Sequence, residues 1–312
     1  MAITAKMVKE LREMSGAGML DCKKALTTTE GDMDKAMEFL REKGLATAQK
    51  KSGRIAAEGI VMLKVTDDCK KAVAVEVNAE TDFVAKNEKF QGYVAQVTEQ
   101  ALETSAADID AFLAEPWKFD TTKTVNEALA GQIAVIGENM KIRRFQQVEE
   151  AEGFIASYTH MGGKIGVLVD VVTDVVNDEI KEMAKNIAMQ VAALNPQYTS
   201  DAEVSADYIA HEKEILIAQI MNDPKESQKP EKVIQGMVAG RIKKELKEIC
   251  LMDQVYVKAE DGKQSVAQYV AQVAKANAAN VTIKGFVRFE TGEGLEKKNE
   301  DFAAEVAAQM GK

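Results

Sequence analysis

Cysteine and histidine are scarce in this chain, and their positions exclude two kinds of site. The three cysteines, Cys22, Cys69 and Cys250, are odd in number and far apart in sequence. A disulfide framework is therefore not expected, whereas reduced thiols inside a cell are. The two histidines, His160 and His211, lie in no cluster with the ligand spacing of a zinc site. We therefore expect no bound metal and no cofactor.

Long apolar runs are also missing. No run approaches the roughly 20 residues that a membrane-spanning helix requires. Residues 1–6 lack the apolar segment of a signal peptide. The sequence therefore predicts a cytoplasmic protein with no membrane partner.

The chain has neither the charge of a nucleic-acid-binding protein nor the loop of a nucleotide-binding one. Its formal net charge of -10 argues against nonspecific binding to a phosphate backbone, although Lys50, Lys51 and Arg54 form one short basic patch. The Gly-Gly-Lys at 162–164 is followed by Ile165, where a phosphate loop needs a hydroxyl residue. We expect no direct contact with nucleic acid.

Hydrophobic residues, at 46%, and charged residues, at 29%, are present in the proportions of a soluble globular protein. At 312 residues the chain is long enough for two or three domains. About the first 45 residues predict a bundle of three short helices, too small to be an enzyme. These helices run from the Thr4 cap to Gly16, from Leu20 to Leu26, and from Asp32 to Gly44. The polar and basic segment 46–54 is interpreted as a linker.

The middle of the chain changes to strand patterns, and it does so twice. Strands at 59–65 and 72–78, a helix over 83–102 and a strand at 140–145 form one unit. About 94 residues further on, strands at 153–158 and 164–171, a helix over 178–194 and a strand at 281–289 repeat it. Two β-β-α-β halves predict a duplicated α+β core.

Residues 201–252 interrupt the second half. Two apolar helical stripes are separated by Pro224 and Pro230, which predicts an antiparallel helical hairpin. The stripes are Val204, Tyr208, Ile215 and Ile220, and then Val233, Met237, Ile242, Leu246 and Ile249. The hairpin is either a dimerisation or docking arm or an ordinary packed element. A final helix carrying Phe302, Val306 and Met310 either folds back on the core or docks on a partner.

The segment Thr81-Asp82-Phe83-Val84 is the sharpest functional candidate. It lies between a buried strand and a polar helix, at a corner where recognition residues often occur. In the functional interpretation, Asp82 and the exposed Phe83 contact a partner. In the structural alternative, Asp82 caps the next helix and Phe83 packs as its staple.

Several motifs together resemble the bacterial translation elongation factor Ts family, the nucleotide-exchange factors for elongation factor Tu. They are GAGMLDCKKAL at 16–26, EVNAETDFVA at 76–85, GENMKIRR at 137–144, IGVLV at 165–169 and GFVRF at 285–289. They occur in the family's order and span almost the whole chain. The resemblance implies a guanine nucleotide exchange factor, and not an enzyme.

The resemblance also implies a domain organisation. It gives a ubiquitin-associated-like domain with a basic linker at 1–54 and a first core subdomain at 55–150. The second core subdomain takes 151–200 and 253–294, the coiled-coil hairpin 201–252, and a C-terminal module 295–312.

In the family, the Thr-Asp-Phe-Val motif dislodges magnesium from elongation factor Tu, which here implies that role for Thr81, Asp82, Phe83 and Val84. His160 matches a histidine that touches a second domain of the partner. Met19, Leu20 and the C-terminal helix match elements that touch its nucleotide-binding domain. Burial in the bundle is the alternative for Met19 and Leu20, and an ordinary loop role is the alternative for His160.

Two departures from the family pattern are local. Met161 replaces a glycine common in the family, and segment 254–257 lacks a proline often found there. Two other functions are weighed against nucleotide exchange. One is an enzyme that uses Cys22 or Cys69 with His160, and the other is an oligomeric scaffold, in the form of a homodimer through the hairpin.

Overall fold

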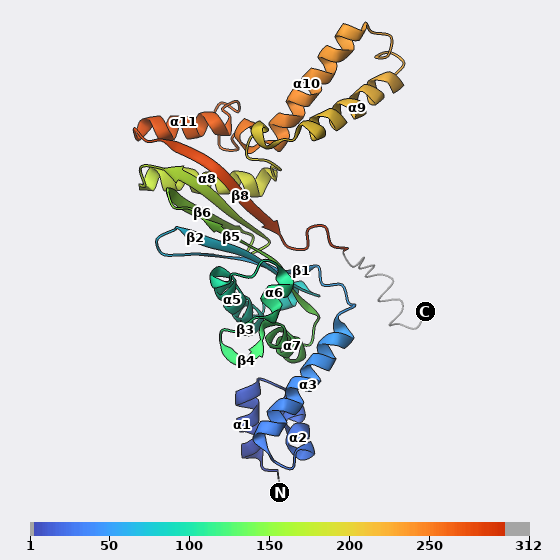
Figure 1. The fold of residues 1–312 in the computed structure, drawn as a ribbon, viewed down its shortest axis with the longest axis vertical. Helices are drawn as coiled ribbons and strands as arrows, with labels where there is room; N and C mark the ends of the chain where they lie inside the picture. The colour runs from blue at the N-terminus through green and yellow to red at the C-terminus, as the bar shows by residue number, and fades with distance from the viewer. Residues whose placement is uncertain (1–2, 297–312) are drawn as a thin grey trace.

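A computed structural model describes residues 3–296 as an elongated α+β molecule in layers (Figure 1). A three-helix bundle forms one end, and a pair of long helices forms the other. Two three-stranded antiparallel sheets lie between them, with helices on their outer sides. The predicted mixed α+β class, beginning with three helices, is confirmed. No helix within residues 3–296 is both long enough and apolar enough to cross a membrane.

The N-terminal bundle consists of α1 (Ala5–Ser15), α2 (Met19–Thr28) and α3 (Met33–Lys51). The Thr4 hydroxyl accepts a hydrogen bond from the Met7 amide at 3.2 Å, and Gly16 ends α1 in the left-handed region at φ 69°. The bundle core contains Leu11, Cys22 and Leu26, all fully buried. The prediction of three N-terminal helices is confirmed.

Helix α3 does not end at Gly44, and most of segment 46–54 is helix and not a linker. Gly44 is buried against α7 (Val125–Ile136), where a Cβ would lie 3.7 Å from the Ala130 carbonyl oxygen. Gly44 is therefore an interior position of a helix packed on α7, and the alanine, lysine and glutamine residues beyond it favour continued helix. An ion pair of 2.5 Å between Arg41 and Glu127 also joins the two helices.

The first half of the core is a sheet in the order β1-β2-β5. Its strands are β1 (Glu58–Val65), β2 (Lys71–Ala79) and β5 (Met140–Glu149). Phe90, Val94 and Ile133 from α5 (Glu88–Glu103) and α7 pack on its outer face. The predicted helix over 83–102 is two helices, α4 (Asp82–Ala85) and α5, because the Asn87 side chain caps α5 through the Lys89 amide at 2.9 Å.

Further elements fill the connection between α5 and β5, where the sequence patterns gave no prediction. They are α6 (Ile109–Ala114), β3 (Pro116–Trp117), β4 (Asp120–Thr124) and α7. Trp117 and Phe112 from this segment are buried in the same core as Phe90. The connection is therefore part of the first half and not a surface loop.

The second half is a sheet in the order β6-β7-β8, with helices α8 and α11 on its outer side (Figure 1). The strands are β6 (Gly153–His160), β7 (Ile165–Thr173) and β8 (Val281–Glu290), and the helices are α8 (Asp178–Leu194) and α11 (Val266–Ala276). The register shifts at Glu76/Val77 in β2 and at Asp170/Val171 in β7, which are equivalent positions of the two halves. Gly59 and Gly153 are equivalent positions as well. The neighbouring strand passes so close to each of them that a Cβ would collide with a carbonyl oxygen, that of Val77 at Gly59 and that of Val171 at Gly153.

The two sheets face each other through one apolar layer. It contains Val61, Ala72, Ala74, Ile155, Leu168, Val287 and Phe289. Strand β2 is buried along almost its whole length because α5 covers one face and the second sheet covers the other. The halves therefore form one continuous core.

The arm consists of α9 (Ala206–Asn222) and α10 (Glu231–Ile249), flanked by the short helices Asp201–Glu203 and Leu251–Asp253. Its buried seam is formed by Ile220, Ile234, Val238 and Ile242. The predicted stripe on α10 was wrong at its start, because Val233 is 45% exposed and Ile234 faces α9. The ends of the arm meet where the Tyr198 amide donates to the Ile249 carbonyl at 3.1 Å. The predicted C-terminal helix with Phe302, Val306 and Met310 lies outside the described residues.

Candidate functional site

The corner at 81–84 joins the end of β2 to the short helix α4. Thr81 is the N-cap of this helix, and its hydroxyl accepts a hydrogen bond from the Val84 amide at 3.3 Å. The alternative in which Asp82 caps the helix was therefore wrong. Phe83 is 81% exposed and does not act as a staple, while Val84 packs partly against the first core cluster. The corner presents one large aromatic side chain to solvent from a structured base.

Asp82 is the acid of this corner and remains ionised at neutral pH. Its carboxylate pairs with Lys86 one helical turn away at 2.6 Å. The Lys86 ammonium, with help from the charge of Lys164, holds the pKa of Asp82 below its usual value. The Asp82 side chain is 46% exposed, so its carboxylate can be reached by a cation or a polar group of a partner.

A carboxylate from the connection between α7 and β5 fixes the backbone of the corner. Glu138 accepts hydrogen bonds from the Thr81 amide at 3.0 Å and from the Thr81 hydroxyl at 2.7 Å. Next to it, the Asn139 amide donates to Glu80 at 2.5 Å. Both Glu138 and Asn139 belong to the GENMKIRR motif, but no local pattern predicted a role for either of them at the corner. The available signal was a polar pair directly after Gly137, which ends α7 at φ 88°.

His160 ends strand β6, and its Nδ1 lies 2.9 Å from the Tyr158 hydroxyl. In the turn that follows, the Met161 side chain is 74% exposed, and its backbone lies in the left-handed region at φ 47°. This turn rests on the first half of the core, because the Val61 amide donates to the Gly163 carbonyl at 2.7 Å. The histidine hairpin therefore contacts both halves.

Lys164 links this hairpin to the corner. Its ammonium pairs with Glu58 at 2.5 Å, and its charge contributes to the lowered pKa of Asp82. Two elements about 80 residues apart in sequence thus lie at one end of the sheet pair. The sequence offered no specific signal for Lys164, because the lysine follows an ordinary Gly-Gly turn.

Met19 and Leu20 lie elsewhere, at the start of α2 in the N-terminal bundle. Their exposed fractions are 60% and 83%, so the alternative of burial within the bundle was wrong. Helix α3 connects this apolar pair to the core. The structure therefore carries two separate candidate contact regions, with α3 between them.

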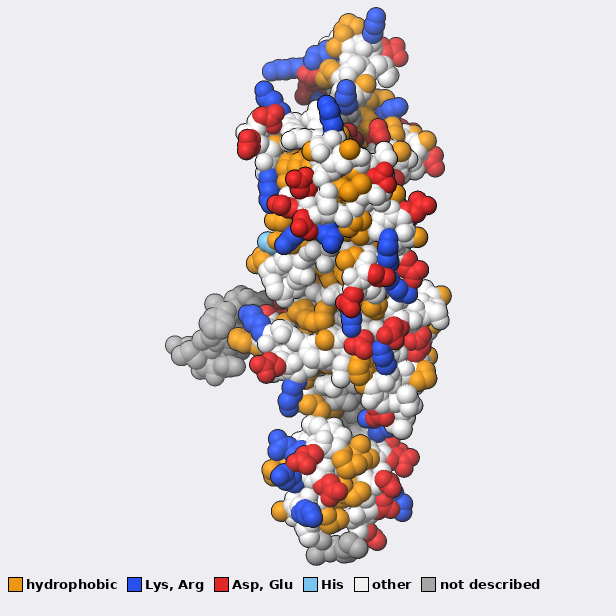
Figure 2. Space-filling model, turned by 90° about the vertical axis from the view of Figure 1, so that its left-hand side faces the viewer, with side chains coloured by type: hydrophobic (Ala, Val, Ile, Leu, Met, Phe, Trp, Pro, Cys, Tyr) orange, Lys and Arg blue, Asp and Glu red, His pale blue; other side chains and the backbone are white. Residues whose placement is uncertain are grey.

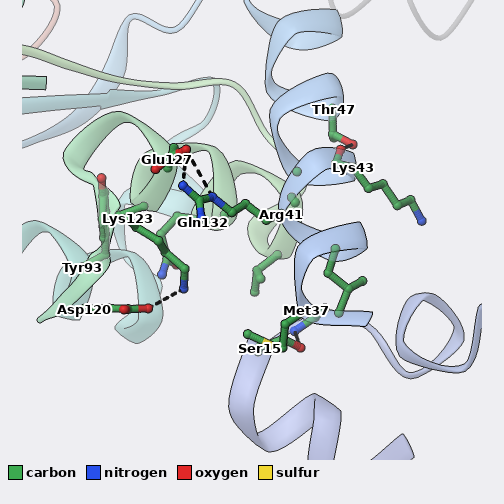
Figure 3. Close-up of a pocket in the computed structure, with 18 of the residues that line it drawn as sticks. Ser15, Met37, Arg41, Lys43, Thr47, Tyr93, Asp120, Lys123, Glu127 and Gln132 are labelled. Carbon is green, nitrogen blue, oxygen red and sulfur yellow. Dashed lines mark hydrogen bonds and ion pairs between the residues drawn. The ribbon is translucent and has the colours of Figure 1, made fainter. Parts of the chain in front are cut away.

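A cleft of about 600 Å³ lies between the bundle and the first half of the core (Figure 3). Arg41 reaches Glu127, and Lys123 pairs with Asp120 at 2.7 Å across the cleft wall. Lys43 also pairs with Asp21 on the bundle side. These charges neutralise one another, so the cleft is a polar seam between two packed parts and not a catalytic pocket.

The residues of the enzyme hypothesis do not gather in one place. Cys22 is buried inside the bundle, Cys69 lies at the turn between β1 and β2, and His160 ends β6. Within residues 3–296, no group of three or more histidine, cysteine or acidic side chains is arranged to hold a metal ion.

On the face drawn in Figure 2, acidic and basic side chains are interspersed from the bundle to the arm.

Comparisons with known proteins agree with this geometry. The family model for elongation factor TS matches residues 80–293, which include the corner and the histidine hairpin. The chain is 51% identical over 310 residues to elongation factor Ts of Clostridium perfringens (strain ATCC 13124), covering 99% of this chain and 100% of that one. It is also 51% identical to the Clostridium tetani protein and 50% identical to the Clostridioides difficile protein, each over 308 residues and 99% of both chains. The chain therefore belongs to the elongation factor Ts family, the nucleotide-exchange factors for elongation factor Tu in translation elongation.

Proposed function

We propose that the chain releases GDP from elongation factor Tu by presenting Phe83 and Asp82 to the partner's nucleotide site. The observation that carries this proposal is Phe83, which is 81% exposed on a corner whose backbone is hydrogen-bonded in place. A large exposed aromatic on a rigid base is suited to insertion into a partner. Thr81 and Val84 hold the corner, Phe83 acts as the wedge, and Asp82 disturbs the water shell of the partner's magnesium.

In the proposed mechanism, the factor and the nucleotide each weaken the binding of the other to the GTPase, and this chain makes or breaks no covalent bond. A GTPase holds GDP through loop amides and a magnesium ion that bridges its phosphates. A factor that binds better to the distorted, metal-free loop weakens nucleotide binding, and nucleotide weakens the factor's binding by the same amount. Reversing a 1:99 equilibrium takes about 5.5 kcal/mol of differential binding, more than one aromatic side chain supplies.

A contact in several parts is therefore required. We assign anchoring roles to Met19 and Leu20 on the bundle, to His160 on its hairpin, and to the C-terminal module at 295–312. Exposure of Met19 and Leu20 supports their assignment. The domain boundaries at 54, 150, 200, 252 and 294, with the ubiquitin-associated-like and coiled-coil character of the two helical parts, belong to the same proposal. Translation elongation takes place in the cytoplasm, which is where the chain acts.

A homodimer through the arm is the second candidate, and it does not exclude exchange activity. The observation that favours it is exposed apolar surface on both arm helices, at Met221 and Val233. As a scaffold without exchange activity, however, the chain has no use for an exposed Phe83. Measuring the release of GDP from elongation factor Tu separates these functions.

The test is stopped-flow release of a fluorescent GDP from elongation factor Tu across a magnesium series. We expect Phe83→Ala to unfold at an unchanged temperature, because the Phe83 side chain has little core contact. The variant should slow GDP release at all magnesium concentrations, because the wedge is absent.

Asp82→Asn should slow GDP release strongly when magnesium is abundant. The defect should be slight when magnesium is chelated, because the step that Asp82 assists has then already occurred. Equal defects of Asp82→Asn with and without magnesium would leave Asp82 a docking residue. A fall of about 3–5 kcal/mol in the free energy of unfolding of Phe83→Ala would show instead that Phe83 has a structural role in the core.

A further inference from the structure

The orientation of Phe83 depends on very few contacts of its own. Helix α4 has 4 residues, and a helix of that length is not stable by itself in water. The Phe83 side chain is almost fully solvated, so packing does not fix its direction. Whatever holds the first residue of the corner therefore decides where the aromatic side chain points.

Glu138 holds that residue with both of its carboxylate oxygens. Oε2 accepts from the Thr81 amide at 3.0 Å, and Oε1 accepts from the Thr81 hydroxyl at 2.7 Å. The same hydroxyl accepts from the Val84 amide at 3.3 Å, within α4. A continuous chain of hydrogen bonds thus runs from Glu138 through Thr81 into the helix that carries Asp82 and Phe83. Hydrogen bonds to a charged acceptor are the stronger kind.

The base of this arrangement is rigid. Glu138 follows Gly137, which ends α7, and it precedes Asn139, which is 8% exposed. The Asn139 side chain donates to the Arg54 carbonyl at 2.8 Å, while the Asn139 amide holds Glu80. Glu138 therefore follows the end of α7 directly, and its neighbour Asn139 ties the chain to the segment after α3 just before β5 begins.

From these contacts we propose that Glu138 is a positioning residue for nucleotide exchange: it sets the direction in which Asp82 and Phe83 meet the partner. The inference rests on the proposed function of the corner. Glu138 acts through Thr81 and need not touch the partner or its nucleotide. Its loss should leave the anchoring contacts at Met19, Leu20 and His160 unchanged.

The expected signature is a change in rate at saturation. Glu138→Ala should lower the GDP-release rate at saturating factor by about tenfold, which corresponds to about 1.4 kcal/mol. The factor concentration at half-saturation should change less than about twofold. Glu138→Gln should recover part of the rate, because an amide keeps one acceptor for the Thr81 amide and offers a donor to its hydroxyl.

A matched control carboxylate lies far from the corner in the same half. Glu115 accepts from the Thr104 hydroxyl at 2.5 Å and from the Gln100 side-chain amide at 3.2 Å. Glu115→Ala removes an equivalent pair of hydrogen bonds and should leave the release rate of the folded protein unchanged. A release defect in Glu115→Ala equal to that in Glu138→Ala would mean that general destabilisation is the cause.

Combined substitutions separate positioning from every other role. In a background that carries both Asp82→Ala and Phe83→Ala, Glu138→Ala should lower the remaining rate by less than about twofold, because both side chains that it orients are absent. The same tenfold loss in both backgrounds would overturn the proposal. If Phe83→Ala alone had no effect, the proposed function of the corner would fail. In that case, a defect in Glu138→Ala alone would show that Glu138 acts by another route.

Discussion

At the scale of single residues, two buried acids at matching positions of the two halves differ in how well the fold stabilises the ionised carboxylate. Glu76 and Asp170 occupy equivalent positions beside the register shift in the central strand of each half. Burial opposes ionisation of Glu76, but hydrogen bonds from the Gly292 amide, Asn78 and Arg143 outweigh it, so its pKa is lowered. Burial dominates at Asp170 and, with the neighbouring Glu150 carboxylate, raises its pKa to about 6, although Lys284 lies 3.6 Å away.

The raised pKa of Asp170 predicts a pH-dependent change in stability. Asp170 binds a proton more tightly in the folded chain than in the unfolded one, so its stabilising contribution is lost as the pH rises from about 4 to about 6. We expect Asp170→Asn to match the wild type in unfolding free energy at pH 4 and to exceed it by about 1–2 kcal/mol at pH 7. Chemical denaturation across this pH range measures the difference.

The equivalent substitution at Glu76 is the control, and its sign is opposite. Glu76→Gln leaves Arg143 and Arg144 without their shared carboxylate, which should cost about 3 kcal/mol at pH 7. The wild-type contribution of Glu76 should be lost as the pH falls below the ordinary value of 4.5, since the folded pKa is lowered. A less stable Asp170→Asn at pH 7 would contradict the assigned direction.

The sequence predicted the exposed residue of the corner and missed the residue that holds it. Phe83 follows a strand whose alternation ends at Ala79, so its exposure could be inferred locally. Glu138 contacts Thr81 across 57 residues, and no local pattern predicts such a pairing. The ionisation states of Glu76 and Asp170 were inaccessible for the same reason, since Gly292 and Lys284 lie far along the chain.

At the scale of elements, the arm could be recognised from its sequence, but its limits could not. Leu251 follows α10 and is fully buried in the core of the second half, inside the segment 201–252 that we assigned to the arm. Its position depends on hydrogen bonds with Tyr198, one of which joins the Leu251 amide to the Tyr198 carbonyl at 2.9 Å. An apolar run, Ile249-Cys250-Leu251-Met252, continues past the end of α10, so hydrophobicity did not mark the boundary.

Two deletions should therefore behave differently. Replacing 206–248 by a short Gly/Ser turn should leave a folded core, because both ends of the arm meet at Tyr198 and Cys250. Replacing 201–252 also removes Leu251, which should cost about 2–5 kcal/mol more. Thermal unfolding measures this difference, and sedimentation of the shorter deletion detects any loss of a dimer. Equal stability of the two deletions would show that Leu251 adds nothing to the core.

Helices α3 and α7 explain the other errors at this scale. Gly44 has the sequence signature of a helix stop, but it lies inside α3, where it is buried against α7 near Ala130. Helix α7 was not predicted because its residues are mostly apolar on all sides, with Val125, Leu129, Ala130 and Ile133 buried. A helix that packs on both a sheet and another helix lacks the single apolar stripe that periodicity detects.

At the scale of the whole molecule, α3 holds the two candidate contact regions at a fixed separation. Its first half belongs to the bundle, and its second half, from Arg41 onward, packs on α7. Lys51 also donates to the Gly137 carbonyl, directly before Glu138. The sequence predicted duplicated halves, but it gave no signal that the two sheets face each other. The central strands β2 and β7 are buried on both faces, so their apolar pattern does not show which face meets the other sheet.

A flexible insertion should reveal what this fixed separation contributes. Inserting Gly-Gly-Ser-Gly between Leu40 and Arg41 should leave both parts folded and the saturating GDP-release rate unchanged. The factor concentration at half-saturation should rise about tenfold, because a flexible connection lowers the effective concentration of the second contact. The same insertion in the turn between α9 and α10 is the control and should change neither quantity. A fall in the saturating rate would instead place the bundle in the exchange step.

The continuity of α3 makes its length a matter of rotation as well as distance. Each residue of an α-helix adds about 1.5 Å and turns the chain by about 100°. A single inserted residue would therefore turn Met19 and Leu20 by about a quarter of a turn around the α3 axis while moving them only about 1.5 Å along it. Removing or adding a full turn, about 5.4 Å, would restore the heading at a different distance. The two candidate contact regions joined by this uninterrupted helix thus have a fixed relative heading, and we expect insertions of whole turns in α3 to be tolerated better than insertions of one or two residues.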